Sequence, residues 1–470
     1  MTDTNQLGRL PWELLEEIVA QLPAPDILTL EKVARGFHDF IRSSPRIQHK
    51  LGLWAAGLEH NLSTSFTLVD SVKALKEYRT RWKSVNIDRY QTTIGTHTFG
   101  ANVDVGGVFA IPKDNGIQFY TLPSSLRAIA PKSHKIRFGS GVAGFTFHPQ
   151  EDVVVVAVPI GRIINLHLIT MSGGVPHPSA LKQIIESETG PISPSHSVFL
   201  SITGHRLASM AENTNTNTIQ LNVWDWRTGE LLFEHHSPYY QSLGFLDDYR
   251  LVISVSASKH GGSPGLLLLD TKRVSLMVPT QTLFHGPVSS RQWICLSEAG
   301  GYHPSPQDTL SSTPFYPASS QRILALSLEP QRGFGVIKVE TLLKLARERA
   351  GEEIHWEEWK PYLVETSTEG TLNASYHWLS GFRLFSASVT KDGRRCDLHV
   401  YDFSPHARMK FLHLAGDGRK VIRPSVVGHR LPWNAMDIHD ITFGHDSMVV
   451  QLCPISLGSI PNVAPDIESL

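Results

Sequence analysis

Three glycines in the first half of the chain, Gly139, Gly141 and Gly144, have the GxGxxG spacing that binds dinucleotides in many enzymes. The motif works because it turns a strand into a helix whose amino terminus holds a pyrophosphate. Here the chain continues as Phe145-Thr-Phe-His-Pro149, which is typical of a strand that ends at a proline. The glycines therefore indicate a turn between strands, and no cofactor is expected.

Histidines and carboxylates are candidates for metal binding and for acid–base catalysis. The 23 histidines include His235-His236, but no HxxxH pair on a predicted helix and no cysteine lies near them, so a metal site is not expected. Glu16-Glu17 and Glu357-Glu358 are adjacent in sequence, and a helix points adjacent side chains apart. We therefore predict no catalytic residues, and the chain is not expected to be an enzyme.

The charge of the whole chain is balanced, with 43 basic and 44 acidic residues and a net charge of -1. This balance argues against nucleic acid or an acidic membrane surface as a partner. The three cysteines, Cys295, Cys396 and Cys453, are scattered and lack CxxC spacing, as is typical of a reducing compartment. Because we find neither a secretory signal nor an uncharged apolar stretch of membrane-spanning length, we expect a cytoplasmic or nuclear protein.

Apolar residues near the amino terminus have a spacing suited to binding another protein. On a helical wheel, the apolar residues of the first predicted helix span an arc of about 140°, with Leu14 at 0°, Ile18 at 40°, Leu22 at 80°, Leu15 at 100° and Val19 at 140°. A helix that covers one small core needs an apolar arc of roughly 100°. Surplus apolar surface on a small helical unit usually marks a partner interface.

A second helix is predicted from Pro25 to about Val33, and it again has more apolar positions than a small unit can bury. The two helices resemble the F-box, the adaptor-docking motif of substrate receptors in Skp–cullin–F-box ubiquitin ligases. The matching residues are Leu10-Pro11, Leu14-Leu15, Ile18, Leu22, Asp26-Ile27-Leu28, Leu30 and Val33. One departure is Ala34, where family members often have cysteine, but both residues are small and commonly buried.

The resemblance implies a Skp-type adaptor as a partner and, through it, a cullin. It also implies which residues bind the adaptor: Leu10, Pro11, Leu14, Leu15, Ile18, Ile27, Leu28, Leu30 and Val33. The target protein and the residues that bind it are not identified by the sequence.

Two further helices are predicted after the F-box. Ser44 and Pro45 are typical of a helix start, and a stripe of Ile47, Leu51, Trp54 and Leu58 follows on one face. The segment Ser71–Lys83 is also amphipathic. It has Val72, Leu75, Tyr78 and Trp82 on one side and basic residues, expected to be solvated, elsewhere.

From about residue 84 the pattern changes to short β-branched or aromatic runs separated by turn residues. Pairs of predicted strands recur every 40 to 60 residues, which is typical of a β-propeller. The pairs are 108–112 with 117–121, 145–147 with 153–158, 206–211 with 219–226, 251–255 with 266–270, 323–328 with 335–339, 382–388 with 398–403, and 441–443 with 448–452.

Leu221–Glu230 resembles the third strand of a WD-repeat blade, with Trp224-Asp225 at its end and a tight turn at Thr228-Gly229. The length predicts seven or eight blades, and we prefer seven. A strand between residues 84 and 110 is expected to pair with one near 438–452 and to close the ring.

The fold class is therefore an α-helical F-box domain followed by an all-β propeller. The expected parts are a flexible amino terminus (1–9), F-box helices (10–44), linker helices (45–83), a propeller (84–455) with a loop insertion (302–320) and a helical insertion (341–360), and a tail (456–470). The predicted function is substrate recognition for a ubiquitin ligase. Two alternatives stay open: a propeller enzyme or small-molecule binder with an incidental F-box, and an F-box scaffold that is not a ligase.

Overall fold

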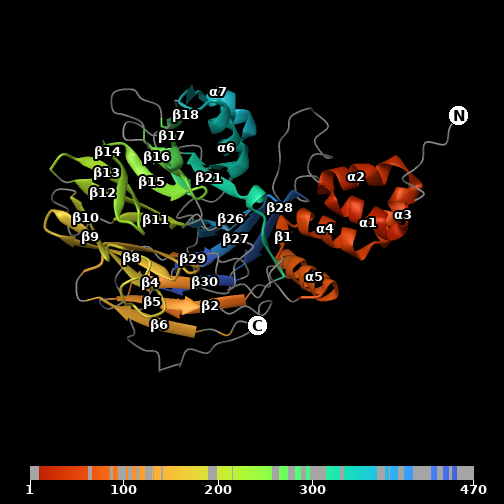
Figure 1. Ribbon diagram of the computed structural model, residues 1–470, viewed down its shortest axis with the longest axis horizontal. Helices are drawn as coiled ribbons and strands as arrows, with labels where there is room; N and C mark the ends of the chain where they lie inside the picture. Colours follow the sequence, from red (N-terminus) through yellow and green to blue (C-terminus); the bar gives the residue numbers. More distant parts are fainter. Residues whose placement is uncertain are drawn as a thin grey trace.

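The computed structural model gives the fold of most of the chain. It describes residues 10–61, 66–84, 88–93, 102–103, 108–112, 116–121, 130, 132–138, 141–188, 198–213, 215–256, 264–273, 281–286, 293–296, 314–328, 333–367, 376–380, 382–389, 396–405, 425–430, 438–443 and 447–452. The predicted amino-terminal segment (1–9) and tail (456–470) lie outside these residues. Figure 1 shows a small helical unit beside a larger arrangement of β-sheets.

Five helices precede the sheets: α1 (Trp12–Gln21), α2 (Ala24–Val33), α3 (Arg35–Ser43), α4 (Pro45–Ala55) and α5 (Leu68–Ser84). Ser44 caps α4 as predicted, because its hydroxyl accepts a hydrogen bond from the Ile47 amide at 3.2 Å. Helices α1 to α4 enclose a core of their own, formed by Val19, Ile27, Phe40, Ile41 and Ile47.

Most of the chain forms antiparallel sheets of consecutive strands, which we call blades. Blade 1 contains β3 (Asn102–Val103), β4 (Val108–Pro112), β5 (Gly116–Thr121) and β6 (Lys132–Arg137), and blade 2 contains β7 (Gly144–His148), β8 (Val153–Ile160), β9 (Ile163–Thr170) and β10 (Ile184–Glu188). Blade 3 contains β11 (Phe199–Thr203), β12 (Arg206–Asn213), β13 (Thr218–Asp225) and β14 (Glu230–Ser237), and blade 4 contains β15 (Tyr240–Phe245), β16 (Arg250–Val255), β17 (Gly265–Asp270) and β18 (Gln281–His285). Blade 5 contains β19 (Trp293–Leu296), β21 (Ile323–Leu328), β22 (Gly333–Lys338) and β24 (Val364–Ser367), blade 6 contains β25 (Tyr376–Ser380), β26 (Arg383–Val389), β27 (Cys396–Asp402) and β28 (Ser425–Arg430), and blade 7 contains β29 (Ile438–Phe443), β30 (Ser447–Leu452) and β2 (Asp88–Thr93).

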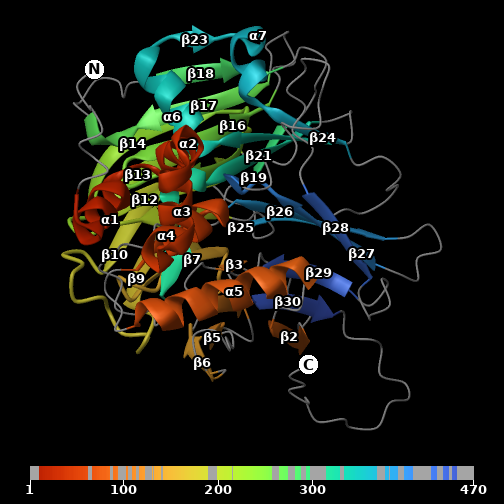
Figure 2. The ribbon, with the colours of Figure 1, turned by 90° about the vertical axis from the view of Figure 1, so that its right-hand side faces the viewer.

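Every predicted strand pair is an antiparallel neighbour pair within one blade, so the propeller prediction is confirmed by the strand pairing. The described residues contain seven blades, and seven as the total for the chain stays a prediction. The predicted ring closure is also present, because β2 pairs with β30. That pairing is parallel and joins the two ends of the propeller sequence (Figure 2).

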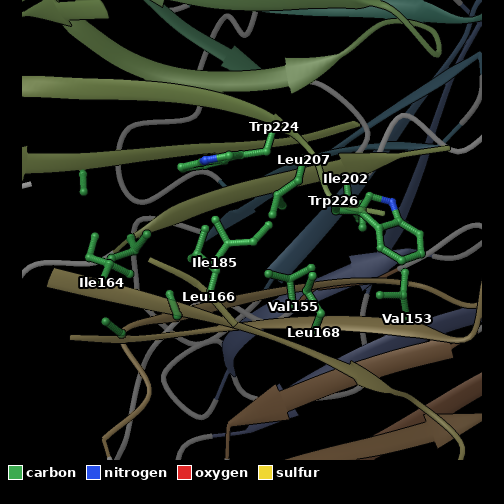
Figure 3. Packing of buried hydrophobic residues seen from close by; sticks show 14 residues of the cluster. Val153, Val155, Ile164, Leu166, Leu168, Ile185, Ile202, Leu207, Trp224 and Trp226 are labelled. Carbon is green, nitrogen blue, oxygen red and sulfur yellow. The ribbon is translucent and has the colours of Figure 1, made fainter. Parts of the chain in front are cut away.

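Strand β8 shows why the blades have continuous apolar runs. Along Val153–Val158 the side chains alternate between two cores, because successive residues of a strand point to opposite faces. One set packs against blade 1 and the other against blade 3. Figure 3 shows the second core, where Val155 and Leu166 of blade 2 lie near Leu207 and Trp224 of blade 3.

Insertions interrupt blade 5 in two places. The first connection contains β20 (Phe315–Pro317) and a short helix, η3 (Ser319–Gln321), and the second contains α6 (Val339–Glu348), β23 (Glu353–Ile354) and α7 (Trp356–Trp359). Helix α6 and Trp359 pack on blades 4 and 5, and β23 extends blade 4 by pairing with β18.

The predicted exposed loop at 302–320 is wrong for residues 314–320, because Phe315 and Tyr316 belong to a buried strand. The rest of that prediction, 302–313, lies outside the described residues.

Candidate functional site

Helix α1 divides its wide apolar arc between two surroundings. Val19 is fully buried in the core of α1 to α4, and Leu15 packs against the same core. Leu14 and Ile18 lie one turn apart at the other edge of the arc, and they are 52% and 45% exposed. Half of the arc therefore serves the unit's own core, and the other half faces solvent.

Helix α2 places one of the residues predicted to bind the adaptor in the core of the helical unit. Ile27 is completely buried in the core, so it stabilises the helical unit, and its contact with an adaptor stays a prediction. Leu30 packs on that core, Leu28 is half-buried, and Val33 is 69% exposed. A period of 3.6 residues identifies an apolar arc but does not say which part of it a neighbouring helix covers.

The remaining predicted contacts lie at the start of α1. Pro11 is exposed and Leu10 is half-buried. Trp12 was not among the predicted contacts, although its side chain is half-exposed and its ring packs edge-on against Phe40 with 4.5 Å between ring centroids. Figure 1 places α1 apart from the blades, and Leu14 and Ile18 are exposed, so the propeller does not cover this face. We call Pro11, Leu14, Ile18 and Val33, with Trp12, the exposed F-box residues.

Polar contacts hold the helical unit together. Glu16 accepts a hydrogen bond from Ser44, whereas its neighbour Glu17 binds Arg46. The hydrogen bond from Arg46 lowers the pKa of Glu17. As predicted for adjacent carboxylates, the two glutamates point to different partners and do not form an acid–base pair. Lys50 Nζ donates to the Ala20 carbonyl at 2.6 Å, which ties α4 to α1.

The segment between α4 and α5 joins the helical unit to the propeller by backbone pairing. Strand β1 (Leu58–His60) pairs with β20 of blade 5. Two flanking hydrogen bonds of 2.9 Å extend this contact, from the Asn61 amide to the Pro314 carbonyl and from the Ala318 amide to the Gly57 carbonyl. The linker is therefore not entirely helical, and Leu58 belongs to β1 rather than to the predicted helix stripe.

Helix α5 makes the second attachment. Leu75, Tyr78 and Trp82 are buried, as predicted, but Val72 is exposed and Ser71 takes the buried position. The Tyr78 ring packs against Phe315, with 5.5 Å between centroids.

At the centre of this attachment lies Arg383, the first residue of β26. Its guanidinium carbon is 4.2 Å from the centroid of Trp82 and 4.4 Å from that of Phe382. Its Nη1 donates to the Tyr78 hydroxyl at 2.7 Å. We call β1, β20, α5 and Arg383 the joint.

The described residues contain no group of three or more histidine, cysteine, aspartate or glutamate side chains that fits a metal ion. Of the GxGxxG segment, Gly144 begins strand β7 and not a helix, as predicted. Gly261-Gly-Ser-Pro-Gly265 has the GxSxG spacing of a nucleophile elbow, although Ser263 lies outside the described residues. Strand β17 follows it, whereas an elbow leads into a helix.

Among the described helices, none is both long enough and apolar enough to span a membrane.

Comparisons with known proteins agree with the amino-terminal assignment. Residues 7–49 match the family model of the F-box domain. No curated protein matches the chain. The carboxy-terminal module is a propeller by its strand pairing, so the chain joins an F-box domain to a β-propeller.

Several solved structures resemble the chain at low identity. Hydrazine synthase of Kuenenia stuttgartiensis is 12% identical, with a TM-score of 0.41 over 65% of this chain and 83% of that chain. The WD40 domain of Toxoplasma gondii coronin is 13% identical, with a TM-score of 0.34 over 68% and 71%. The β-propeller domain of the Trilobed protease from Pyrococcus furiosus is 11% identical, with a TM-score of 0.30 over 64% and 74%.

Proposed function

We propose that this protein is the substrate-recognition subunit of a Skp–cullin–F-box ubiquitin ligase in the cytoplasm or nucleus. F-box domains generally bind Skp-type adaptors, and residues 7–49 match that domain. The observation that carries the proposal is the exposure of Leu14 and Ile18 on a helix whose other apolar residues already fill a core. An adaptor would cover them, and a cullin would bind through the adaptor.

The chain would contribute no reactive group to ubiquitin transfer. Holding a target lysine near a charged conjugating enzyme raises its effective concentration, which accelerates transfer by proximity. This role requires a fixed relation between the adaptor-binding and target-binding parts. The joint supports it, because backbone pairing at β1 and the buried Arg383 both connect the two modules.

The joint also favours one rim of the propeller for target binding. In an antiparallel blade, the turn between the first two strands and the turn between the last two lie at the same end. Arg383 begins β26 and Asp402 ends β27, so the joint lies at that end of blade 6. The insertions of blade 5 occupy the equivalent end, which we call the joint rim. We propose that the target binds the opposite rim, where β8 turns into β9 at Gly161.

Adaptor binding tests the proposal directly. The double variant Leu14→Asp, Ile18→Asp places two carboxylates where an apolar partner surface is expected, and it should weaken binding of a purified Skp-type adaptor by at least about 100-fold. Both side chains are exposed, so the fold should be retained. Leu181→Asp is the matched control, because Leu181 is an exposed leucine on blade 2, 82% accessible.

Equal adaptor binding by the double variant and the wild type would contradict the proposed interface. A second measurement separates ligase from scaffold: the wild-type protein with adaptor should retain a cullin in pull-downs. Adaptor recovered without cullin would contradict the ligase assignment while leaving the F-box contact intact.

A further inference from the structure

Helix α5 has a second face that the propeller does not use. On a helical wheel of α5 with Leu68 at 0°, the buried side chains lie between about −80 and −20°, and they are Leu75, Tyr78 and Trp82. A different sector, from about 0 to 100°, carries Leu68, Val69 and Val72. These three side chains are 39%, 77% and 41% exposed, and the preceding Phe66 is 39% exposed. An apolar surface of this kind usually marks a contact with another molecule.

Basic residues lie in or beside this sector further along the helix: Arg79 at about 20° and Lys76 at about 80° fall within it, and Lys73 lies just outside it at about 140°. Lys73 and Lys76 are exposed and Arg79 is partly exposed. In all, α5 has five basic and two acidic residues.

The two acidic residues of α5 already have partners. Asp70 accepts a hydrogen bond from Thr67 at 2.6 Å, and Glu77 binds Arg81 at 2.7 Å. Within the described part of the chain, Lys73, Lys76 and Arg79 form no ion pair. We call Phe66, Leu68, Val69 and Val72, together with these three basic residues, the outer face of α5. Its chemistry suits a segment that places acidic side chains next to an apolar one.

The position of α5 indicates which partner brings such a segment. The buried side of α5 lies on the joint rim, and the outer face occupies a different sector of the same helix. Helix α4 contacts both α1 and α5, and Figures 1 and 2 both place α5 directly beside α4. A protein bound to the exposed F-box residues is therefore the nearest candidate, whereas a target on the opposite rim is distant.

We propose that the outer face of α5 is a second contact for the Skp-type adaptor, which it binds through an acidic segment containing an apolar side chain. This inference rests on the proposed function and extends the adaptor interface beyond the F-box. The F-box contact supplies apolar burial. The basic residues steer association and fix the orientation of the bound adaptor.

Two variants test the outer face separately from the F-box. Lys73→Glu, Lys76→Glu, Arg79→Glu reverses its charge, and Val69→Ser, Val72→Ser removes its apolar part. Each should lower the affinity for purified adaptor by about tenfold, and the charge-reversed variant should lose most of the salt dependence of binding. The matched control is Lys344→Glu, Arg347→Glu, which reverses two exposed charges on α6 at the same rim.

The outcomes distinguish this inference from the proposed function. If Leu14→Asp, Ile18→Asp abolishes adaptor binding while both outer-face variants bind within twofold of the wild type, only the second contact is overturned. If the wild type does not bind adaptor, the proposed function itself fails. Light scattering tests a second copy of the chain as the occupant. If adaptor affinity is unchanged and the wild type is a dimer that Val69→Ser, Val72→Ser dissociates, the outer face binds another copy and the inference is overturned. The same holds if phosphatidylserine vesicles bind the wild type but not the charge-reversed variant.

Discussion

Blades 3 and 6 carry the same pair of charged residues at the same place and use it differently. In blade 3, Arg206 at the start of β12 lies opposite Asp225 at the end of β13, and their side chains form an ion pair of 2.8 Å. In blade 6, Arg383 lies opposite Asp402 in the same register, but the distance between charged groups is 3.7 Å. The guanidinium of Arg383 has turned toward α5.

The difference shows how a repeated position becomes an attachment point. In blade 3 the aspartate also accepts hydrogen bonds from the amides of Arg227 and Thr228, so the pair belongs to a turn within one blade. In blade 6 the arginine reaches Tyr78, 305 positions earlier in the chain. A repeat supplies the cation, and the linker helix supplies aromatic rings around it.

The largest expected effect comes from removing this cation. Arg383→Ala should destabilise the joint by about 2–4 kcal/mol, because it removes a buried hydrogen bond and the cation–π contacts with Trp82 and Phe382. Hydrogen exchange at the Asn61 amide, which bonds to Pro314 in the joint, measures the effect. Its exchange should accelerate by about 30-fold or more.

Arg206→Ala is the matched control in blade 3. It removes a largely buried ion pair, with side chains 12% and 18% exposed, but the cost should stay within blade 3 and leave the Asn61 amide unchanged. Equal protection of Asn61 in the two variants would mean that Arg383 does not hold the joint.

A smaller effect is expected at Gly57, immediately before β1. Its φ is +69°, and a Cβ there would lie 2.7 Å from the Phe382 ring. Gly161 in blade 2 has a φ of +64° but open space around it. Both alanine variants should lose about 1 kcal/mol to backbone strain, and Gly57→Ala should lose about 1–2 kcal/mol more to overpacking. Thermal melts and Asn61 exchange give the difference. No difference would show that the ring moves aside without cost.

The sequence predicts the blades well because each is local. The two strands of each predicted pair are separated by about ten residues or fewer, and alternating or continuous apolar runs report burial on one or both faces. The joint is not predictable in this way. Strands β1 and β20 have three residues each, too few for a period, and more than 250 positions separate them. Nothing in Tyr78 or Arg383 alone indicates that the two side chains meet.

The candidate site is predicted in part for the same reason. The apolar arc of α1 is visible in the sequence, but its division between core and solvent depends on where α3 and α4 pack. Ile27 is the clearest case, since its apolar character fits a core residue as well as a partner contact, and the structure makes it core.

The smallest expected effect is a difference between the joint and blade 3 in how stability depends on pH. His49 of α4 is buried, and its Nε2 has no hydrogen-bond partner among the residues that the structure describes. Its ring lies edge-on to that of His60, with 5.6 Å between centroids. Burial, with a smaller contribution from His60, lowers the pKa of His49. A histidine whose pKa is lowered by folding contributes stability that is complete above its unfolded pKa of about 6.5 and is lost as the pH falls.

Exchange of the Asn61 amide, corrected for intrinsic rates, should therefore increase a few-fold between pH 7.5 and pH 5.5, whereas the Trp226 amide of blade 3 should change less. Glu59 in β1 acts in the opposite direction, because burial raises its pKa and its contribution is lost as the pH rises. The decisive comparison is thus between variants: His49→Phe should remove the acid-dependent part at Asn61, and the exposed control His236→Gln should retain it. If His49→Phe shows the same acid-dependent exchange at Asn61, a group other than His49 causes it. Arg383 and the paired strands β1 and β20 would then be the features that distinguish blade 6 from blade 3.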